Sequence, residues 1–386
     1  MKNIILFTFL SFIVLSTSSC DNSYKESKVK LVLTGSVHGQ LDPCGWKKNP
    51  LGGLSRKFIA IDNMRKKGED PLILDAGDMF FSKTNISSNI KSEKFRCSTM
   101  LQGYEKIGCD ALNIGKYELL AGVSFLKQME KKYKSIPFVS ANIKYKDTGE
   151  LLFRPYIIEE RDGLKIGVIG LSNMVPDTMT NIIADDYIKT GNTFIRNLKN
   201  QVDLIILLVN TDRNSQSALT KNFGEADFIF TSGSTHRTSA SMHQISDGPY
   251  VYANGKQGKY LTLIDLDIKN NKDPISDLSS KEQKVRQLTN RLQRLQKKDP
   301  SKKLENIYSG QDNILNLIKR YRSELETAET FVEKAVNKMR FSSLALNKKI
   351  NDDPEILAMV DVALNKFKIL DVDKNSTSVN KHHNHD

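Results

Sequence analysis

The sequence predicts an α/β fold followed by a helical region. Between Val29 and Asp267, short runs rich in Val, Ile and Leu alternate with amphipathic stretches, which is the pattern of strands covered on both faces by helices. From Asp277 to Arg340 the pattern changes to apolar residues three, four and seven positions apart, interrupted by one proline and one glycine. That spacing is typical of long amphipathic helices. The chain therefore divides into a strand-rich domain and a helical appendage.

The elements follow from these patterns in chain order. Two helices are expected between the first strands, at Leu54–Arg65 and Ser92–Ile107. In the second region the apolar positions predict a coiled-coil-like hairpin of two helices that turns near Pro300. Six runs are the expected strands: Val29–Thr34, Pro71–Asp75, Pro137–Ser140, Leu164–Ile169, Val202–Leu208 and Ala226–Phe230. The predicted boundaries are 29–270 for the α/β domain, 277–345 for the hairpin appendage, 346–372 for a C-terminal helix and 373–386 for a disordered polar tail.

The N-terminus has the layout of a bacterial secretion signal. A positive head at Met1–Asn3 precedes the apolar stretch Ile4–Leu15 and a run of small residues that ends at Cys20. Residues 1–19 are the predicted signal peptide, and residues 20–28 a polar tether. A cysteine directly after the predicted cleavage site resembles the lipobox of bacterial lipoproteins, which implies a lipid anchor on Cys20. The alternative is an ordinary signal peptide and an exported protein without a lipid. We expect a protein of the bacterial cell envelope, lipid-anchored to a membrane outside the cytoplasm.

Composition excludes several classes of protein. The chain is 39% hydrophobic and 26% charged with a mean hydropathy of -0.41, which is ordinary for a globular protein. Its one long apolar stretch is too short for a membrane span of about 20 residues, so a multi-span membrane protein is excluded. Four cysteines without a Cys-x-x-Cys spacing exclude a disulfide-built scaffold, a cysteine zinc ribbon and attached haem c. Cys44 either pairs with Cys97 or Cys109 and leaves one thiol unpaired, or all three are buried and reduced.

Positive charge is concentrated in the helical region. Between Asp277 and Lys349 there are 17 Lys and Arg and nine Asp and Glu, against a formal net charge of +12 for the whole chain. Such basic helices predict an anionic envelope partner, either lipid or polymer. Nucleic acid is disfavoured, because no aromatic residue is interleaved in the first helix. The alternative is the solvated face of a helical hairpin.

Polar residues gather where the predicted strands end, and ligands bind at the carboxyl ends of strands in open α/β sheets. Five blocks stand there in order: Thr34–Leu41, Leu74–Phe80, Leu112–Glu118, Ser140–Asn142 and Tyr252–Tyr260. Together they resemble the signature blocks of calcineurin-like metallophosphoesterases of the 5′-nucleotidase branch. The resemblance covers about Val29 to Asp267. It implies a metallophosphoesterase-like β-sandwich flanked by helices, with two metal ions at the strand ends.

The same resemblance implies a degraded metal site. Three positions keep the residue type of a family ligand: His38, Asp78 and His236. Four ligand positions are replaced: Ser36, Lys116, Asn210 and Ser234. Tyr117 stands where the family has the histidine that assists the leaving group, so no catalytic residue is assigned.

The three retained residues are candidate ligands for one divalent transition metal, Zn, Mn or Fe. The second metal site is expected to be empty, because the ammonium of Lys116 repels a divalent ion. Haem is not expected, since no haem motif follows the Cys44 loop. The alternative is that His38, Asp78 and His236 are remnants held by hydrogen bonds to neighbouring loops.

Two classes of function remain open at this stage. The first is a non-catalytic envelope lipoprotein, a pseudoenzyme that acts as a binding or scaffold module. The second is a weak one-metal phosphoesterase that hydrolyses an exported phosphate ester. Nothing after Asp267 resembles the second domain that nucleotidases of this branch use to bind the base.

Overall fold

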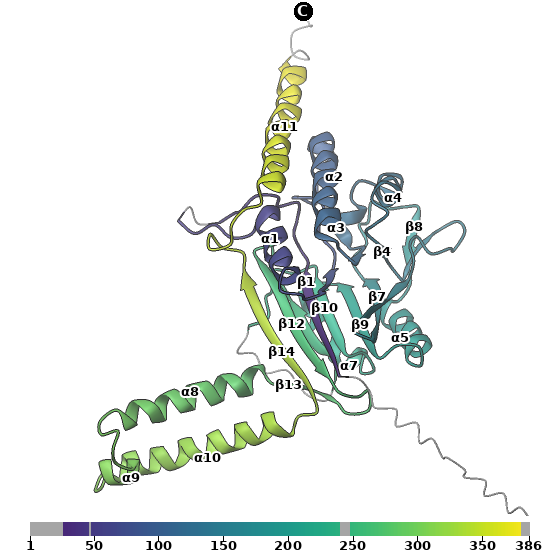
Figure 1. Cartoon of the computed structure of the whole chain (residues 1–386). Helices are drawn as coiled ribbons and strands as arrows, with labels where there is room; N and C mark the ends of the chain where they lie inside the picture. The colour runs from purple at the N-terminus through teal and green to yellow at the C-terminus, as the bar shows by residue number, and fades with distance from the viewer. Residues whose placement is uncertain (1–25, 46–47, 240–247, 380–386) are drawn as a thin grey trace, which may run out of the picture.

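The fold consists of two facing β-sheets with helices on their outer sides (Figure 1). The computed structural model describes residues 26–45, 48–239 and 248–379. The predicted signal peptide, Cys20 and most of the tether lie outside the described residues. Among the described residues, no helix is long and apolar enough to cross a membrane.

The larger sheet has seven strands in the order β13-β14-β12-β1-β2-β3-β4. Its members are β1 (Ser27–Thr34), β2 (Leu72–Asp75), β3 (Ala111–Asn113), β4 (Phe138–Val139), β12 (Tyr260–Ile268), β13 (Ile275–Asp277) and β14 (Asn337–Ala345). Strand β1 pairs in parallel with β2 and antiparallel with β12. Because side chains alternate along a strand, Leu31 and Leu33 of β1 pack in the core between the sheets, while Val32 packs under the outer helices.

The smaller sheet has five strands in the order β11-β10-β9-β7-β6. They are β6 (Tyr156–Arg161), β7 (Leu164–Ser172), β9 (Leu204–Asn210), β10 (Phe228–Ser232) and β11 (Tyr250–Ala253). A separate two-stranded sheet joins β5 (Ile143–Tyr145) to β8 (Ile182–Ala184). Strands β7, β9, β10 and β11 run parallel, so their carboxyl ends share one edge of the sheet.

Short helices and loops connect the strands of this α/β body. They are α1 (Leu54–Arg65), a 3-10 turn (Ser87–Asn89), α2 (Ile90–Ile107), α3 (Lys116–Leu119), α4 (Val123–Lys132), α5 (Tyr187–Leu198), α6 (Arg213–Gln216) and α7 (Leu219–Asn222). Helices α1 and α2 cover the outer face of the larger sheet through a core that includes Ile61 and Leu101. Helix α5 covers the smaller sheet through Ile195 and Leu198. The predicted fold class is confirmed.

The helical hairpin is an insertion in the larger sheet rather than an appendage after it. Helices α8 (Ser279–Gln296), α9 (Leu304–Ile307) and α10 (Asp312–Lys334) lie between strands β13 and β14 and extend away from the body (Figure 1). We call residues 279–334 the arm. The predicted helical appendage, residues 277–345, is therefore wrong at its C-terminal end, because Asn337–Ala345 forms strand β14. Its buried residues Asn337, Met339 and Phe341 alternate with more exposed ones, which is a strand period that the helix pattern obscured.

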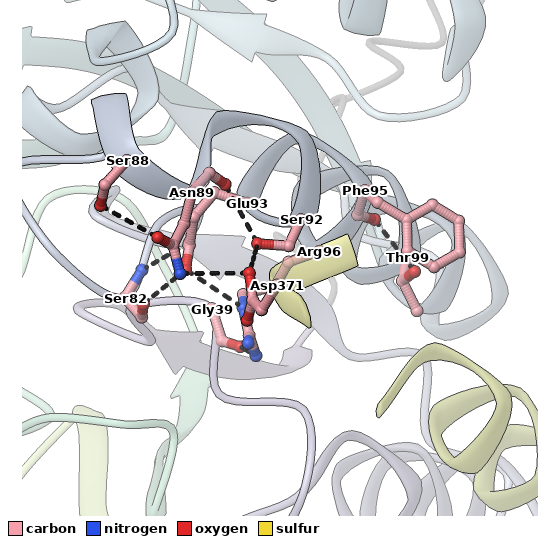
Figure 2. Close-up of polar contacts among 10 residues, drawn as sticks. All are labelled: Gly39, Ser82, Ser88, Asn89, Ser92, Glu93, Phe95, Arg96, Thr99 and Asp371. Atoms are coloured by element: carbon pink, nitrogen blue, oxygen red, sulfur yellow. Dashed lines mark hydrogen bonds and ion pairs between the residues drawn. The ribbon is translucent and has the colours of Figure 1, made fainter. Parts of the chain in front are cut away.

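Helix α11 (Pro354–Val379) follows β14 and packs on α1 and α2. Its buried residues include Val360 and Phe367. Figure 2 shows the polar contacts at its outer end, where Asp371 accepts hydrogen bonds from Asn89 (3.1 Å) and Ser92 (2.8 Å) at the start of α2. The range 373–386 was expected to be disordered, but α11 continues to Val379; residues 380–386 lie outside the described residues.

Candidate functional site

The predicted site residues lie at the carboxyl ends of the parallel strands of both sheets. Ser36 and His38 follow β1, and Asp78 follows β2. Lys116 and Tyr117 begin α3, directly after β3. The second sheet contributes Asn210, which ends β9, and Ser234 and His236, which follow β10. The strand-end blocks of the sequence therefore meet at one edge of the fold.

The backbone at this site is held in an uncommon conformation. Ser36, His38 and Asp78 have φ angles of 51°, 52° and 57°. Such left-handed conformations cost non-glycine residues roughly 1 kcal/mol or more each and cluster at functional sites. Hydrogen bonds between the two loops maintain them: Ser36 N donates to Gly77 O (2.8 Å) and His38 N to Asp78 O (3.0 Å).

Asp78 is fully buried and is engaged by protein donors. Its Oδ1 accepts a hydrogen bond from the backbone N–H of Tyr117 (3.1 Å), and the side chain of Asn210 donates to the same carboxylate. Burial raises the pKa of Asp78 to about 6, and these two hydrogen bonds counteract part of that rise. The carboxylate thus receives N–H groups at the position where the family resemblance implies a metal ion.

Asn210 connects the two sheets at the centre of the site. Its Oδ1 accepts from Lys116 N (3.0 Å), and its Nδ2 donates to Ser232 Oγ (2.7 Å). Ser232 Oγ donates in turn to Ala76 O (2.7 Å). A Cβ on Gly115 would lie 2.7 Å from Cγ of Asn210, so the glycine is required for this close approach.

Ser36 and Ser234 also have protein partners. Ser36 Oγ accepts from Gly233 N (3.2 Å), and Ser234 Oγ hydrogen-bonds Gln216 (3.0 Å). Both hydroxyls therefore link neighbouring loops in the place of family ligands.

His38 is the one site side chain in the described residues whose buried nitrogen has no partner. Its Nδ1 is buried without a hydrogen bond. Its ring lies against Tyr117, with 4.5 Å between the ring centroids. Burial, and secondarily the positive charge of Lys256, lowers the pKa of His38 to about 4. The imidazole is therefore neutral at neutral pH.

Lys116 and His236 occupy the rim of the site. Both are half-buried. Within the described residues no carboxylate lies within 4 Å of the Lys116 ammonium, so Lys116 forms no direct ion pair with Asp78. The positive charge of Lys116 still lowers the pKa of Asp78, but by less than the hydrogen bonds to the carboxylate do.

Glu118 supports the site from beneath, and none of the sequence patterns above marks it as a site residue. The side chain is completely buried. Its two oxygens accept from the backbone N–H groups of Asp78 (2.9 Å), Met79 (2.7 Å), Phe80 (3.2 Å) and Gly115 (2.9 Å). Burial raises its pKa. Glu118 fixes the loop that presents Asp78, and only its place beside Lys116 and Tyr117 in the third block could have drawn attention to it.

A second buried polar group lies beneath the site. Lys57 Nζ donates to Thr34 Oγ1 (3.1 Å) and to the hydroxyl of Tyr104 (2.6 Å), and that hydroxyl donates to Asp75 Oδ2 (2.8 Å). Burial lowers the pKa of Lys57 to about 8, against the opposing charge of Asp75. The sequence signal was an opposite-charge pair at apolar positions, Asp75 at the end of a strand and Lys57 inside a helix.

The cysteines near the site are free thiols. Cys44 is partly exposed, and Cys97 and Cys109 are buried. No disulfide joins Cys44 to either of the others. The burial expected in the reduced alternative holds for Cys97 and Cys109 but not for Cys44.

The residues present do not fit a two-metal centre. Within the described part of the chain, no group of three or more His, Cys, Asp or Glu side chains could hold a metal ion, so His38, Asp78 and His236 are not assembled as a ligand set. The oxygens and nitrogens of Ser36, Asn210 and Ser234 serve protein hydrogen bonds, and Lys116 adds a cation.

Part of the chain is similar in sequence to known proteins. No family model matches it. The protein UshA of Escherichia coli (strain K12) is 32% identical over 174 residues, which are 44% of this chain and 28% of UshA. A 5′-nucleotidase of Vibrio cholerae is 32% identical over 154 residues, 38% of this chain and 26% of that protein. The chain thus spans little more than a quarter of the length of these relatives.

Two solved structures have the same fold. The 5′-nucleotidase precursor from Thermus thermophilus matches with a TM-score of 0.52 and 22% identity, over 64% of this chain and 52% of that one. The calcineurin-like phosphoesterase YfkN from Bacillus subtilis matches with a TM-score of 0.57 and 16% identity, over 89% of this chain and 99% of that one. The α/β body of this chain is therefore similar in sequence to UshA and to 5′-nucleotidases, and it has the fold of calcineurin-like phosphoesterases.

Proposed function

We propose that this chain is an exported lipoprotein whose metallophosphoesterase domain is a binding or scaffold module without two-metal hydrolysis. The observation that carries the proposal is the use of ligand positions for protein hydrogen bonds. Asn210 bonds Lys116 N and Ser232, and Asp78 accepts from Tyr117 N and Asn210. A metal ion at either position would compete with these donors for the same oxygens.

The proposed ligand is anionic. Two cations, Lys116 and Lys256, stand beside His38 and Asp78, and each acts electrostatically on one of them. Positive charge supplied by ammonium groups favours an anion such as a phosphate ester, which the site would bind without the second metal that hydrolysis requires.

The alternative proposal is a one-metal phosphoesterase. The observation in its favour is the buried Nδ1 of His38, which has no partner, because imidazole nitrogen is a common metal ligand. No reaction step is derived for this alternative, since the described residues assemble no three-ligand group.

Metal analysis and turnover separate the two proposals. The purified chain should contain less than one equivalent of Zn, Mn or Fe and hydrolyse aryl phosphate and nucleotide poorly. The five replacements Ser36→Asp, Lys116→Asn, Tyr117→His, Asn210→His and Ser234→His, made together, should raise metal occupancy. One equivalent of metal that is lost in His38→Ala, together with metal-dependent turnover, would establish the one-metal alternative. Two equivalents with turnover like that of an intact relative would refute both.

A further inference from the structure

The positive charge of the arm lies at its far end. Residues 287–322, which we call the arm tip, contain nine Lys and Arg and three Asp and Glu. The remaining arm residues, 279–286 and 323–334, contain four Lys and Arg and five Asp and Glu. The excess charge of the arm is therefore confined to the tip, where α8 ends, α9 lies and α10 begins.

Much of this charge is not neutralised within the protein. Two of the three tip acids are engaged, Asp299 by Lys302 and Glu305 by Arg322. Arg294, Lys297, Lys303 and Lys319 are exposed, and among the described residues none has a carboxylate within 4 Å. A small apolar cluster with Leu304, Tyr308 and Ile318 holds the tip together. The tip is thus a folded surface that presents free cations.

The arm leaves the body at the end of the larger sheet where strand β1 begins. Ser27, the first residue of β1, pairs with Ile268 of β12, and the adjacent Asp267 pairs with Lys338 at the start of β14. The arm is inserted directly before β14 and extends away from the body there (Figure 1). The candidate site lies at the opposite end of β1, after Thr34.

A lipid on Cys20 would place a membrane at this end. Ser27 lies seven positions after Cys20, and a chain of that length spans at most about 25 Å when fully extended. Helix α10 has 23 residues, or about 35 Å. Tether and arm therefore have comparable reach from the same end of the sheet.

We propose that the arm tip docks on the anionic phospholipid surface of the membrane that holds the lipid anchor. This inference rests on the lipid anchoring in the proposed function. A lipid anchor combined with a basic patch holds a protein on an anionic membrane more firmly than either signal alone. The docked arm would orient the protein with its candidate site facing away from the bilayer.

Vesicle cosedimentation tests the arm without the lipid anchor. The chain from Asp21 to Asp386, which carries no lipid, is mixed with phosphatidylcholine vesicles with or without 30% phosphatidylglycerol at several salt concentrations. We expect binding that requires phosphatidylglycerol and falls steeply with salt. Since each Lys or Arg near an anionic surface contributes about fivefold in affinity, Arg294→Gln, Lys297→Gln, Lys303→Gln and Lys319→Gln together should weaken it by about 600-fold.

The matched control replaces four exposed lysines of the body by glutamine: Lys67, Lys146, Lys189 and Lys221. It should bind nearly as well as the unchanged chain, and circular dichroism should show equal helix content in both variants. The proposal would be overturned if both variants lost the same amount of vesicle affinity, or if the chain bound phosphatidylcholine vesicles as well as those with phosphatidylglycerol. It would also be overturned if a 20-mer oligonucleotide bound more tightly and displaced the vesicles. A failed lipid anchor leaves vesicle binding by this lipid-free chain intact, so the two failures are distinguishable.

Discussion

A carboxylate without a metal ion has to be stabilised by hydrogen bonds or kept protonated, and single residues of this chain show both effects. Glu118 receives four backbone N–H groups, and Asp78 receives two donors. Elsewhere, Asp227 accepts one bond, from Ile205 N (2.8 Å), and burial raises its pKa to about 6. One donor is too few to offset the cost of burying its charge.

Asp227→Asn should stabilise the protein at neutral pH and not at acid pH. The pKa of Asp227 is higher in the folded chain than the ordinary 3.8, so its contribution to stability is complete below that value and is lost as the pH rises through 6. Asparagine keeps the acceptor for Ile205 N without a charge. Urea unfolding should give the variant on the order of 1–2 kcal/mol more unfolding free energy at pH 7.5 and no advantage near pH 4. An equal difference at both pH values would contradict the assignment.

The sequence could predict the positions of the site residues but not their partners. Ser36, His38, Asp78 and Asn210 each end a buried strand or follow it, and that placement is a local property. The bond from Lys116 N to Asn210 joins residues 94 positions apart, and the four bonds to Glu118 involve backbone groups, which leave no mark in the sequence. A metal ligand set is hard to predict for the same reason: identity at three positions does not fix the distances between them.

At the level of elements, α11 shows how the end of the chain is attached. Phe367 is buried against Phe95, with 5.9 Å between ring centroids, and the Arg96 guanidinium lies 4.1 Å from the Phe367 ring centroid. Arg96 also donates to Gly39 O (3.1 Å; Figure 2). Gly39 follows His38, so α11 and the site loop are connected through one arginine.

Phe367→Ala should detach or loosen α11. Removing a buried phenylalanine typically costs about 3–5 kcal/mol, whereas Val362→Ala on the same helix should cost little, because Val362 is 67% exposed. Guanidinium unfolding measures the cost, and limited proteolysis should cut Phe367→Ala within residues 347–353. Equal stability of the two variants would show that α11 does not pack as described.

Local periodicity explains which elements were predictable. The apolar spacing of α8 and α10 is regular over several turns, so the sequence predicts the hairpin and its turn near Pro300. Strand β14 was missed because Met339 also continues the helical spacing of α10, and only its pairing with β12 and β13 makes it a strand. That pairing connects Ile275 to Asn337 across the whole arm, and a window of sequence contains no such information.

On the scale of the molecule, the structure has two ends with different chemistry. The candidate site, with Lys116 and Lys256, lies at the carboxyl ends of the parallel strands. The first described strand and the root of the arm lie at the other end. Export and anchoring would set which end faces the membrane.

Cys20→Ala should release the protein from the membrane. In a bacterium that processes lipoproteins, the unchanged chain should partition into detergent, and mass spectrometry should find a lipid on an N-terminal Cys20. The variant should lose that lipid and, after cleavage by another route, should be recovered in the aqueous phase. A soluble product that begins at another residue and is unaffected by the substitution would refute anchoring.

The position of the arm has a consequence for the order of synthesis. Strand β14 lies inside the larger sheet, between β13 and β12, although it is made after all the other described strands. Until the ribosome has passed Ala345, one edge of β12 has no partner and β13 has none at all. A chain shortened before β14 would expose a hydrogen-bonding edge that promotes aggregation. The larger sheet can therefore close only after residue 345 has been made, which leaves the nascent chain with an open sheet edge throughout the synthesis of the arm.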